Sequence, residues 1–137
     1  NTVFNIIIIF NPLSYPVRDY FFGRNNMNVK IVTSQQKMTA YLDGEIDHHT
    51  AGGIREEIDN ALMTKKPEVL KLDFDNVTFM DSSGVGLVMG RYRTLSMFGG
   101  KLIVSNLSPQ FYKIMKLSGL EKIATINKRE NEYESKK

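Results

Sequence analysis

Residues 69–86 read VLKLDFDNVTFMDSSGVG. Residues 69–74 are the most clearly predicted strand of the chain, and Val77 and Phe79 continue its apolar side after a bend at residues 75–76. A short polar stretch follows, and apolar residues then recur at intervals of three and four, as they do on one face of a helix. The stretch therefore predicts a strand followed directly by an amphipathic helix. The predicted apolar stripe of this helix consists of Val85, Val88, Met89, Tyr92 and Leu95.

Upstream of this unit, the sequence predicts a hairpin and a helix. Apolar and polar residues alternate over residues 29–42 around a polar turn at 34–37, which indicates two antiparallel strands. Residues 43–45 end or bend the second strand, and the polar loop at 47–50 can cap the helix that follows. The predicted apolar positions of that helix are Ile54, Ile58, Ala61 and Leu62.

Downstream, strands are predicted at residues 101–104 and 123–126. Between them lies a helix with Ser108 as N-cap and Pro109 at the first helical position. The order of elements is ββαβαβαβ, which predicts an α/β fold. We expect a single domain with a mixed, largely parallel sheet of 4–5 strands and helices packed against it. The predicted apolar stripe of the last helix is Phe111, Ile114, Met115 and Leu117.

The composition of the chain excludes several classes of protein. Its 137 residues are 42% hydrophobic and 24% charged, which suits one globular domain. The chain has no Cys, so a disulfide framework or a Cys nucleophile is excluded and a cytoplasmic location is expected. The net charge of +3 is spread along the chain and forms no basic stripe, so nucleic acid is not an expected partner. Two adjacent His cannot form a three-His zinc site, and no metal or cofactor is predicted.

The two ends of the chain differ from its middle. The apolar run at residues 3–10 is far shorter than the roughly 18 residues that span a bilayer, so no membrane association is predicted. Residues 1–26 are either a short apolar peptide added to the domain or a segment upstream of a natural start at Met27. We expect an N-terminal extension over residues 1–26 and the domain over residues 27–126. Residues 127–137 form a polar tail, which we expect to be a frayed helix or disordered.

The first candidate site is Asp81-Ser82-Ser83-Gly84, where the predicted strand turns into a helix. Ligands and functional groups gather at the carboxyl ends of strands in open α/β sheets. A hydroxyl there lies near unpaired helix N–H groups and the positive end of the helix dipole. Plain N-capping is the structural alternative, because Asp and Ser are preferred cap residues. Position alone leaves both interpretations open.

A second candidate is a nucleotide site at Gly84, Gly86 and Gly90, which follow a strand as a dinucleotide fingerprint does. Their spacing is G-x-G-x-x-x-G, which is not that of the fingerprint, and no Lys-Ser/Thr pair completes a P-loop. Close packing of the helix on the sheet explains the glycines better than a nucleotide does. A small nucleotide-binding or nucleotide-hydrolysing domain remains the alternative function.

A third candidate is a hydrolase that uses Ser82 with His48 or His49 and an Asp. The G-x-S-x-G motif of such enzymes is missing, and adjacent histidines in a polar loop are expected to be solvated. Asp73 and Asp75 alternate along one strand, and we expect both to face solvent.

Several short stretches of this sequence together resemble one family. They are residues 44–50 (GEIDHHT), 79–86 (FMDSSGVG), 90–92 (GRY), 99–100 (GG) and 118–120 (SGL). In this order they are similar to the anti-sigma F factor antagonists of spore-forming bacteria, which belong to the STAS domain group (sulfate transporter and anti-sigma factor antagonist). The resemblance covers about residues 27–126, and the chains of that family begin about where Met27 stands. The tail is shorter and more polar than the closing helix of the family.

The resemblance implies a binding protein of sporulation that is switched by phosphorylation and is not an enzyme. Its dephosphorylated form would bind an anti-sigma factor that is also a serine kinase using ATP, and would thereby release the sigma factor. A serine phosphatase would reverse the modification. By position in the motif, Ser82 is the phosphate acceptor, and the partner-binding residues are Asp47, Asp81, Ser82, Ser83 and Gly84.

Overall fold

The computed structural model describes residues 5–10, 18–23 and 28–130, the first two stretches by their backbone. Met27 and residues 131–137 lie outside the described residues. The elements are β1 (Asn5–Phe10), β2 (Arg18–Gly23), β3 (Val29–Ser34), β4 (Lys37–Ile46), α1 (Ala51–Lys65), β5 (Val69–Met80), α2 (Ser82–Ser96), β6 (Lys101–Leu107), α3 (Pro109–Leu117), the 3₁₀ helix η1 (Leu120–Lys122) and β7 (Thr125–Lys128). None of the helices in this part of the chain is long and apolar enough to span a bilayer.

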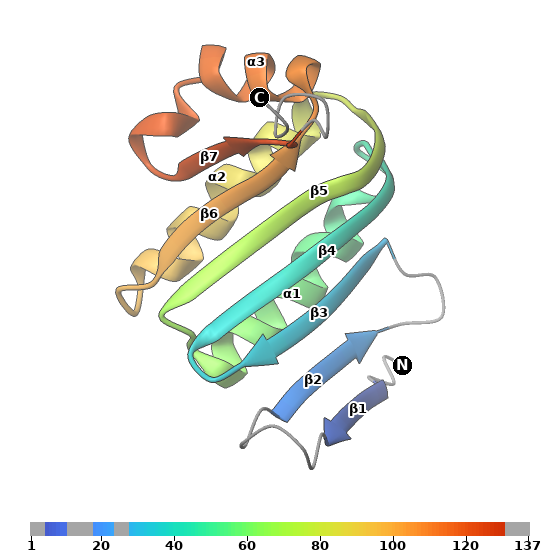
Figure 1. Cartoon of the computed structure of the whole chain (residues 1–137), viewed down its shortest axis with the longest axis vertical. Coiled ribbons are helices and arrows are strands. Elements are labelled where there is room, and N and C mark those ends of the chain that lie inside the picture. Colours follow the sequence, from blue (N-terminus) through green and yellow to red (C-terminus); the bar gives the residue numbers. More distant parts are fainter. Residues whose placement is uncertain (1–4, 11–17, 24–27, 131–137) are drawn as a thin grey trace.

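The strands form one sheet in chain order, β1 to β7 (Figure 1). β3 and β4 are antiparallel, whereas β4, β5, β6 and β7 run parallel to one another. The five strands from β3 to β7 are the mixed, largely parallel sheet that the sequence predicts. β1 and β2 are antiparallel strands that extend this sheet beyond β3.

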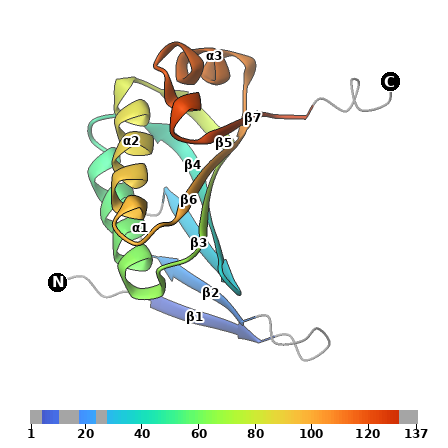
Figure 2. The ribbon, with the colours of Figure 1, turned by 90° about the vertical axis from the view of Figure 1, so that its left-hand side faces the viewer.

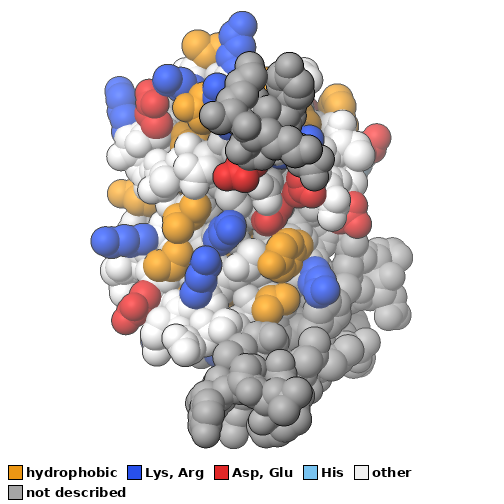
Figure 3. Space-filling model, viewed as in Figure 1, with side chains coloured by type: hydrophobic (Ala, Val, Ile, Leu, Met, Phe, Trp, Pro, Cys, Tyr) orange, Lys and Arg blue, Asp and Glu red, His pale blue; other side chains and the backbone are white. Residues whose placement is uncertain are grey.

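Helices α1 and α2 lie against the same face of the sheet (Figure 2). The hydrophobic core lies between these two helices and the sheet. It includes the predicted apolar positions on α1, all of which are buried. Within the described residues, no helix covers the other face of the sheet. Hydrophobic and basic side chains mix on that face (Figure 3), where Tyr41 is 42% exposed and Lys71 and Ile103 are half-buried.

β5 runs without interruption through residues 75–76, where the sequence predicts a bend. It has 12 residues, whereas its neighbour β4 has 10. Two register shifts between these strands absorb the difference, and each shift reverses the face to which the following side chains point. Val77 is therefore buried, but Phe79 points outward and is 49% exposed. The assignment of Phe79 to the apolar side was wrong for this reason.

Asp73 is buried rather than facing solvent, so that expectation was also wrong. One carboxylate oxygen accepts a hydrogen bond from the Asp75 N–H at 2.9 Å, and the other accepts one from the Asn106 side-chain amide at 2.9 Å. These bonds satisfy the carboxylate, so its burial is tolerated. Asp75 is exposed and pairs with Arg129 at 2.9 Å, which ties the end of β7 to β5. β7 extends to Lys128, two residues beyond the predicted end of the domain at residue 126.

The predicted apolar stripe of α2 was partly wrong. Val88 and Leu95 are buried, but Met89 and Tyr92 are 42% and 38% exposed. Gly84 and Arg91 occupy core-facing positions in their place. On α3, Phe111 and Met115 are buried as predicted and Ser108 caps the helix, whereas Leu117 is 78% exposed.

Arg91 joins α2 to α1 through an ion pair in which Arg91 is buried and Asp59 is partly exposed. The Arg91 side chain is 3% exposed, and its Nε lies 2.9 Å from a carboxylate oxygen of Asp59 on α1. Burial lowers the pKa of Arg91, and the Asp59 carboxylate opposes this shift by stabilising the charged form. The pair therefore fixes how α1 and α2 sit against each other, because Arg91 has this carboxylate as its counterion.

Removal of Asp59 tests this account. Asp59→Asn leaves the Arg91 charge buried without a counterion, and we expect a loss of about 1–2 kcal/mol, since Asp59 is itself partly exposed. The double variant Asp59→Asn/Arg91→Met removes both charges and regains most of that stability. Urea unfolding measures both values, with Glu68→Gln on the exposed loop before β5 as the control. A single variant as stable as the wild type contradicts the account.

The N-terminal extension gives a second prediction. β2 shares a single registered residue pair with β3, Phe22 with Ile31. A chain that begins at Met27 therefore keeps the five strands β3–β7 and all of the described helices. We expect its thermal midpoint to lie within about 5 °C of that of the full chain at equal concentration. A larger drop would show that residues 1–26 contribute to the stability of the domain.

Candidate functional site

The candidate site lies where β4 and β5 end side by side. Ile46 and Met80 are the last registered pair of these parallel strands. The Asp81 N–H donates to the Ile46 carbonyl at 3.1 Å and closes the ladder. Asp47 and Asp81 are each the first residue after their strand, so the structure brings these two predicted residues to the same edge of the sheet.

Asp81 caps helix α2. Its backbone is extended, and a side-chain oxygen accepts a hydrogen bond from the Ser83 N–H at 2.7 Å. Its carbonyl accepts one from the Gly84 N–H at 3.0 Å. Asp81 thus satisfies N–H groups that a helix leaves unpaired at its start.

Ser82 is the first residue of α2 and is exposed. The capping alternative for this stretch is therefore confirmed at Asp81, whereas Ser82 is not the cap. No described residue forms a hydrogen bond with its hydroxyl. The hydroxyl lies at the positive end of the helix dipole, where added negative charge is favoured. Ser83 is half-buried, and its N–H is already bonded to Asp81.

Gly84 lets α2 approach the sheet closely. A Cβ at this position would lie 2.2 Å from Cγ and 2.3 Å from Sδ of the buried Met80 side chain. At Gly86 and Gly90 a Cβ would meet no described atom within 4 Å, so the packing explanation holds at Gly84 and is wrong at these two positions. All three glycines lie inside α2 rather than in a loop, which is not the geometry of a phosphate-binding loop.

The loop after β4 is held by Asp47 and Thr50. One oxygen of Asp47 accepts hydrogen bonds from the His49 and Thr50 N–H groups at 2.9 and 3.0 Å. The Thr50 hydroxyl accepts from the Asp47 N–H at 3.0 Å and donates to the Glu45 carbonyl at 2.8 Å. The hydrogen bond from Thr50 lowers the pKa of Asp47, and the His49 N–H adds to this effect while partial burial opposes it.

Thr50 is a residue that sequence reasoning missed, although a Thr three positions after an Asp in a polar loop is a signal for such a turn. Its side chain bonds back to the end of β4 and does not cap α1, contrary to the expectation for this loop. His48 and His49 are exposed, with ring centroids 3.9 Å apart, and no described hydrogen bond joins either ring to Ser82. Over the described part of the chain, no group of three or more metal-ligating side chains is found.

The fold and this edge define a class of protein: a single-sheet α/β domain that presents an exposed serine at a helix start, at the sheet edge where two carboxylates follow neighbouring strands. Comparison with known proteins gives the family. The STAS domain model matches residues 28–133. The chain is 34% identical over 101 residues to the anti-sigma F factor antagonist of Paenibacillus polymyxa, with 74% of this chain and 86% of that protein covered. The antagonist of the same name from Lysinibacillus sphaericus is 37% identical over 89 residues and covers 65% of this chain and 76% of its own.

Two solved structures carry the same fold. The anti-sigma factor antagonist SpoIIAA in its unphosphorylated form has a TM-score of 0.64 at 33% identity, covering 78% of this chain and 91% of that one. The phosphorylated form of SpoIIAA, described as a Bacillus cell fate determinant, has a TM-score of 0.60 at 33% identity, covering 78% and 95%. The chain therefore belongs to the STAS domain family and, within it, to the anti-sigma factor antagonists. This family is regulatory.

The contrast among the α2 glycines gives a testable prediction. Gly84→Ala forces Met80 to move, at a cost of about 1–3 kcal/mol that exceeds the roughly 1 kcal/mol gained in helix propensity. Gly86→Ala has open space and should stabilise the domain by about 0.5–1 kcal/mol. Denaturant unfolding of both variants measures the difference. Equal effects at the two positions would mean that α2 is not seated on Met80.

Proposed function

We propose that this chain is an anti-anti-sigma factor switched at Ser82. Its dephosphorylated form binds an anti-sigma factor that is also a serine kinase and so releases a sigma factor. Phosphorylation of Ser82 ends the binding, and a serine phosphatase restores it. The observation that carries the proposal is the division of roles at the start of α2. Asp81 caps the helix and leaves Ser82 exposed, with no hydrogen bond from its hydroxyl to any residue that the structure describes.

The chemistry of the switch requires little from this chain. The Ser82 oxygen attacks the terminal phosphorus of the ATP held by the kinase, the bond to the bridging oxygen breaks so that ADP leaves, and the hydroxyl proton passes to a base of the kinase. The product carries about −1.5 to −2 charge at pH 7. At the N-terminus of α2 this charge is stabilised by the helix dipole, so the domain is expected to stay folded in both states. Both partner reactions use cytoplasmic components, so the proposal puts the chain in the cytoplasm.

The readout of the switch is electrostatic and steric. Ser82 follows Asp81 at the edge of the sheet where Asp47 follows β4, and Ser83 and Gly84 shape the entry to the helix. A phosphate raises the negative charge of an edge that already carries two carboxylates. Acidic groups of the partner would then be repelled, and the bulk of the phosphate would separate the surfaces. SpoIIAA, a relative of this chain, has been solved in a phosphorylated and an unphosphorylated form, which supports the proposal that this chain is also phosphorylated.

The acceptor can be identified with two matched variants. The chain is incubated with ATP and the anti-sigma F factor of Paenibacillus polymyxa. This factor is chosen because a relative of the chain in that organism is named as its antagonist. We expect intact mass to show one added phosphate on the wild type and on Ser83→Ala, and none on Ser82→Ala. Ser82→Ala should keep its stability within about 0.5 kcal/mol, because the hydroxyl is exposed and Asp81 remains the cap. A phosphate that maps to Ser83 overturns the assignment.

A charge mimic tests the electrostatic part. Ser82→Asp adds about one negative charge and should weaken binding of the same anti-sigma factor about tenfold, less than phosphate does. Ser82→Asn has nearly the same shape without the charge and serves as the control. Titration calorimetry gives both affinities, and circular dichroism checks that both variants stay native. Equal affinities for the two variants would exclude a switch by charge.

A further inference from the structure

Helix α2 carries an apolar stripe that begins at Val85, which packs against the edge of the core, and continues over two exposed residues, Met89 and Tyr92. Val85, Met89 and Tyr92 follow Ser82 at intervals of three and four residues, so they share one side of the helix. Val85 is half-buried, and Met89 and Tyr92 are 42% and 38% exposed. With a rise of about 1.5 Å per residue, the stripe runs about 15 Å from Ser82 to Tyr92.

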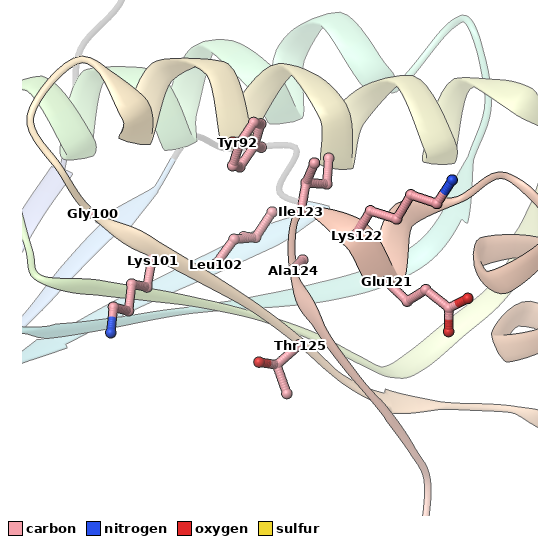
Figure 4. Close-up of a pocket in the computed structure, with 9 residues that line it drawn as sticks. All are labelled: Tyr92, Gly100, Lys101, Leu102, Glu121, Lys122, Ile123, Ala124 and Thr125. Carbon is pink, nitrogen blue, oxygen red and sulfur yellow. The ribbon is translucent and has the colours of Figure 1, made fainter.

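The stripe ends in a groove. Tyr92 of α2, Leu102 of β6 and Ile123 after η1 point into the same space (Figure 4), which has a volume of about 350 Å³. The groove exists because β7 first pairs with β6 at Thr125 and Ile103, so no β7 residue pairs with Leu102. Its walls are apolar at Tyr92, Leu102 and Ile123 and polar elsewhere, and its small volume suits one or two side chains rather than a large ligand.

The rim of the groove is charged. Lys101, Lys122 and Glu121 line it and are all exposed, so the rim has a net charge of +1. The Ser82 end of α2 is different, because Asp47 and Asp81 make it acidic. The two ends of this surface therefore favour opposite charges on whatever binds along it.

We infer that this groove is a second anchoring point for the anti-sigma factor, and that it takes an apolar side chain flanked by a carboxylate. The inference rests on the proposed function, because the stripe and the groove lie on the same side of α2 as Ser82, from which the kinase must approach. An exposed aromatic side chain beside a pocket is typical of the residues that dominate binding energy in protein interfaces. The groove thereby holds the kinase on the chain while Ser82 is presented to it.

The distance between the two ends has a consequence for the switch. About 15 Å exceeds the screening length of about 8 Å at physiological salt, so a phosphate on Ser82 acts only weakly at the groove. Changes at the groove and at Ser82 should therefore affect binding independently. A groove variant should raise the KM of phosphorylation and leave kcat unchanged, because the contact is made equally in the ground and transition states.

Two matched pairs of variants test the inference, again with the anti-sigma F factor of Paenibacillus polymyxa. Tyr92→Ala and Met89→Ala should each weaken binding about tenfold. Tyr41→Ala on the open sheet face and Met63→Ala on α1 remove side chains of similar exposure, 42% and 47%, and should stay within about twofold of the wild type. Tyr92→Ala combined with Ser82→Asp should show the product of the two single effects. If Tyr92→Ala lowers the thermal midpoint, a second variant replaces it. Ala124→Leu narrows the groove and should weaken binding in the same way.

The outcomes separate this inference from the proposed function. Unchanged affinity of Tyr92→Ala and Met89→Ala, together with weak binding by Ser82→Asp, overturns the groove and leaves the switch standing. An equal loss in Tyr41→Ala moves the anchor to the open face of the sheet and also overturns it. A wild-type chain that neither binds the anti-sigma factor nor gains a phosphate overturns both.

Discussion

The hydrogen bond from the Asp81 N–H to the Ile46 carbonyl is the contact on which the site depends. It ends the parallel ladder of β4 and β5 at one edge, although β5 is two residues longer (12 against 10). The register shifts that absorb this difference place Asp47 and Asp81 at the same level of the sheet. Without these shifts, the ends of β4 and β5 would lie at different levels of the sheet. Asp47 would then lie farther from the start of α2.

A second constraint separates capping from signalling at the start of α2. In many helices one Ser both caps and is exposed, and its modification would remove the cap. Here Asp81 accepts the Ser83 N–H at 2.7 Å, so a phosphate on Ser82 need not disturb the helix. Two contacts position α2: Gly84 packs against Met80 at the end of β5, and Arg91 pairs with Asp59 of α1. With α2 positioned in this way, a phosphate on Ser82 can change the affinity for the partner without unfolding the domain.

Periodicity was sufficient to predict the order of the strands and α-helices from β3 to β7, the hairpin and the face of α1, and capping preferences predicted the start of α3. It failed where a residue's face depends on a partner strand: the register shifts that expose Phe79 are a property of β4 and β5 together. It also failed at Arg91 and Asp73. Both are buried beside partners far away in the sequence, the Asp59 carboxylate for the charge of Arg91 and the Asn106 amide for the carboxylate of Asp73, which no local pattern records. The motif located Ser82, but only the geometry distinguished it from its capping neighbour. The boundaries of the domain at residues 27 and 126 stay a prediction.

The most direct test of the account is to separate the phosphorylated and unphosphorylated chain and to measure, for each, the affinity for the anti-sigma factor together with amide hydrogen exchange. The account predicts binding at least about tenfold weaker for the phosphorylated form, with unchanged protection in β4, β5 and β6. Changes in exchange should be confined to the Asp47 loop and the first turn of α2. Equal affinity of the two forms, or a loss of protection throughout the sheet, would contradict a local switch at Ser82.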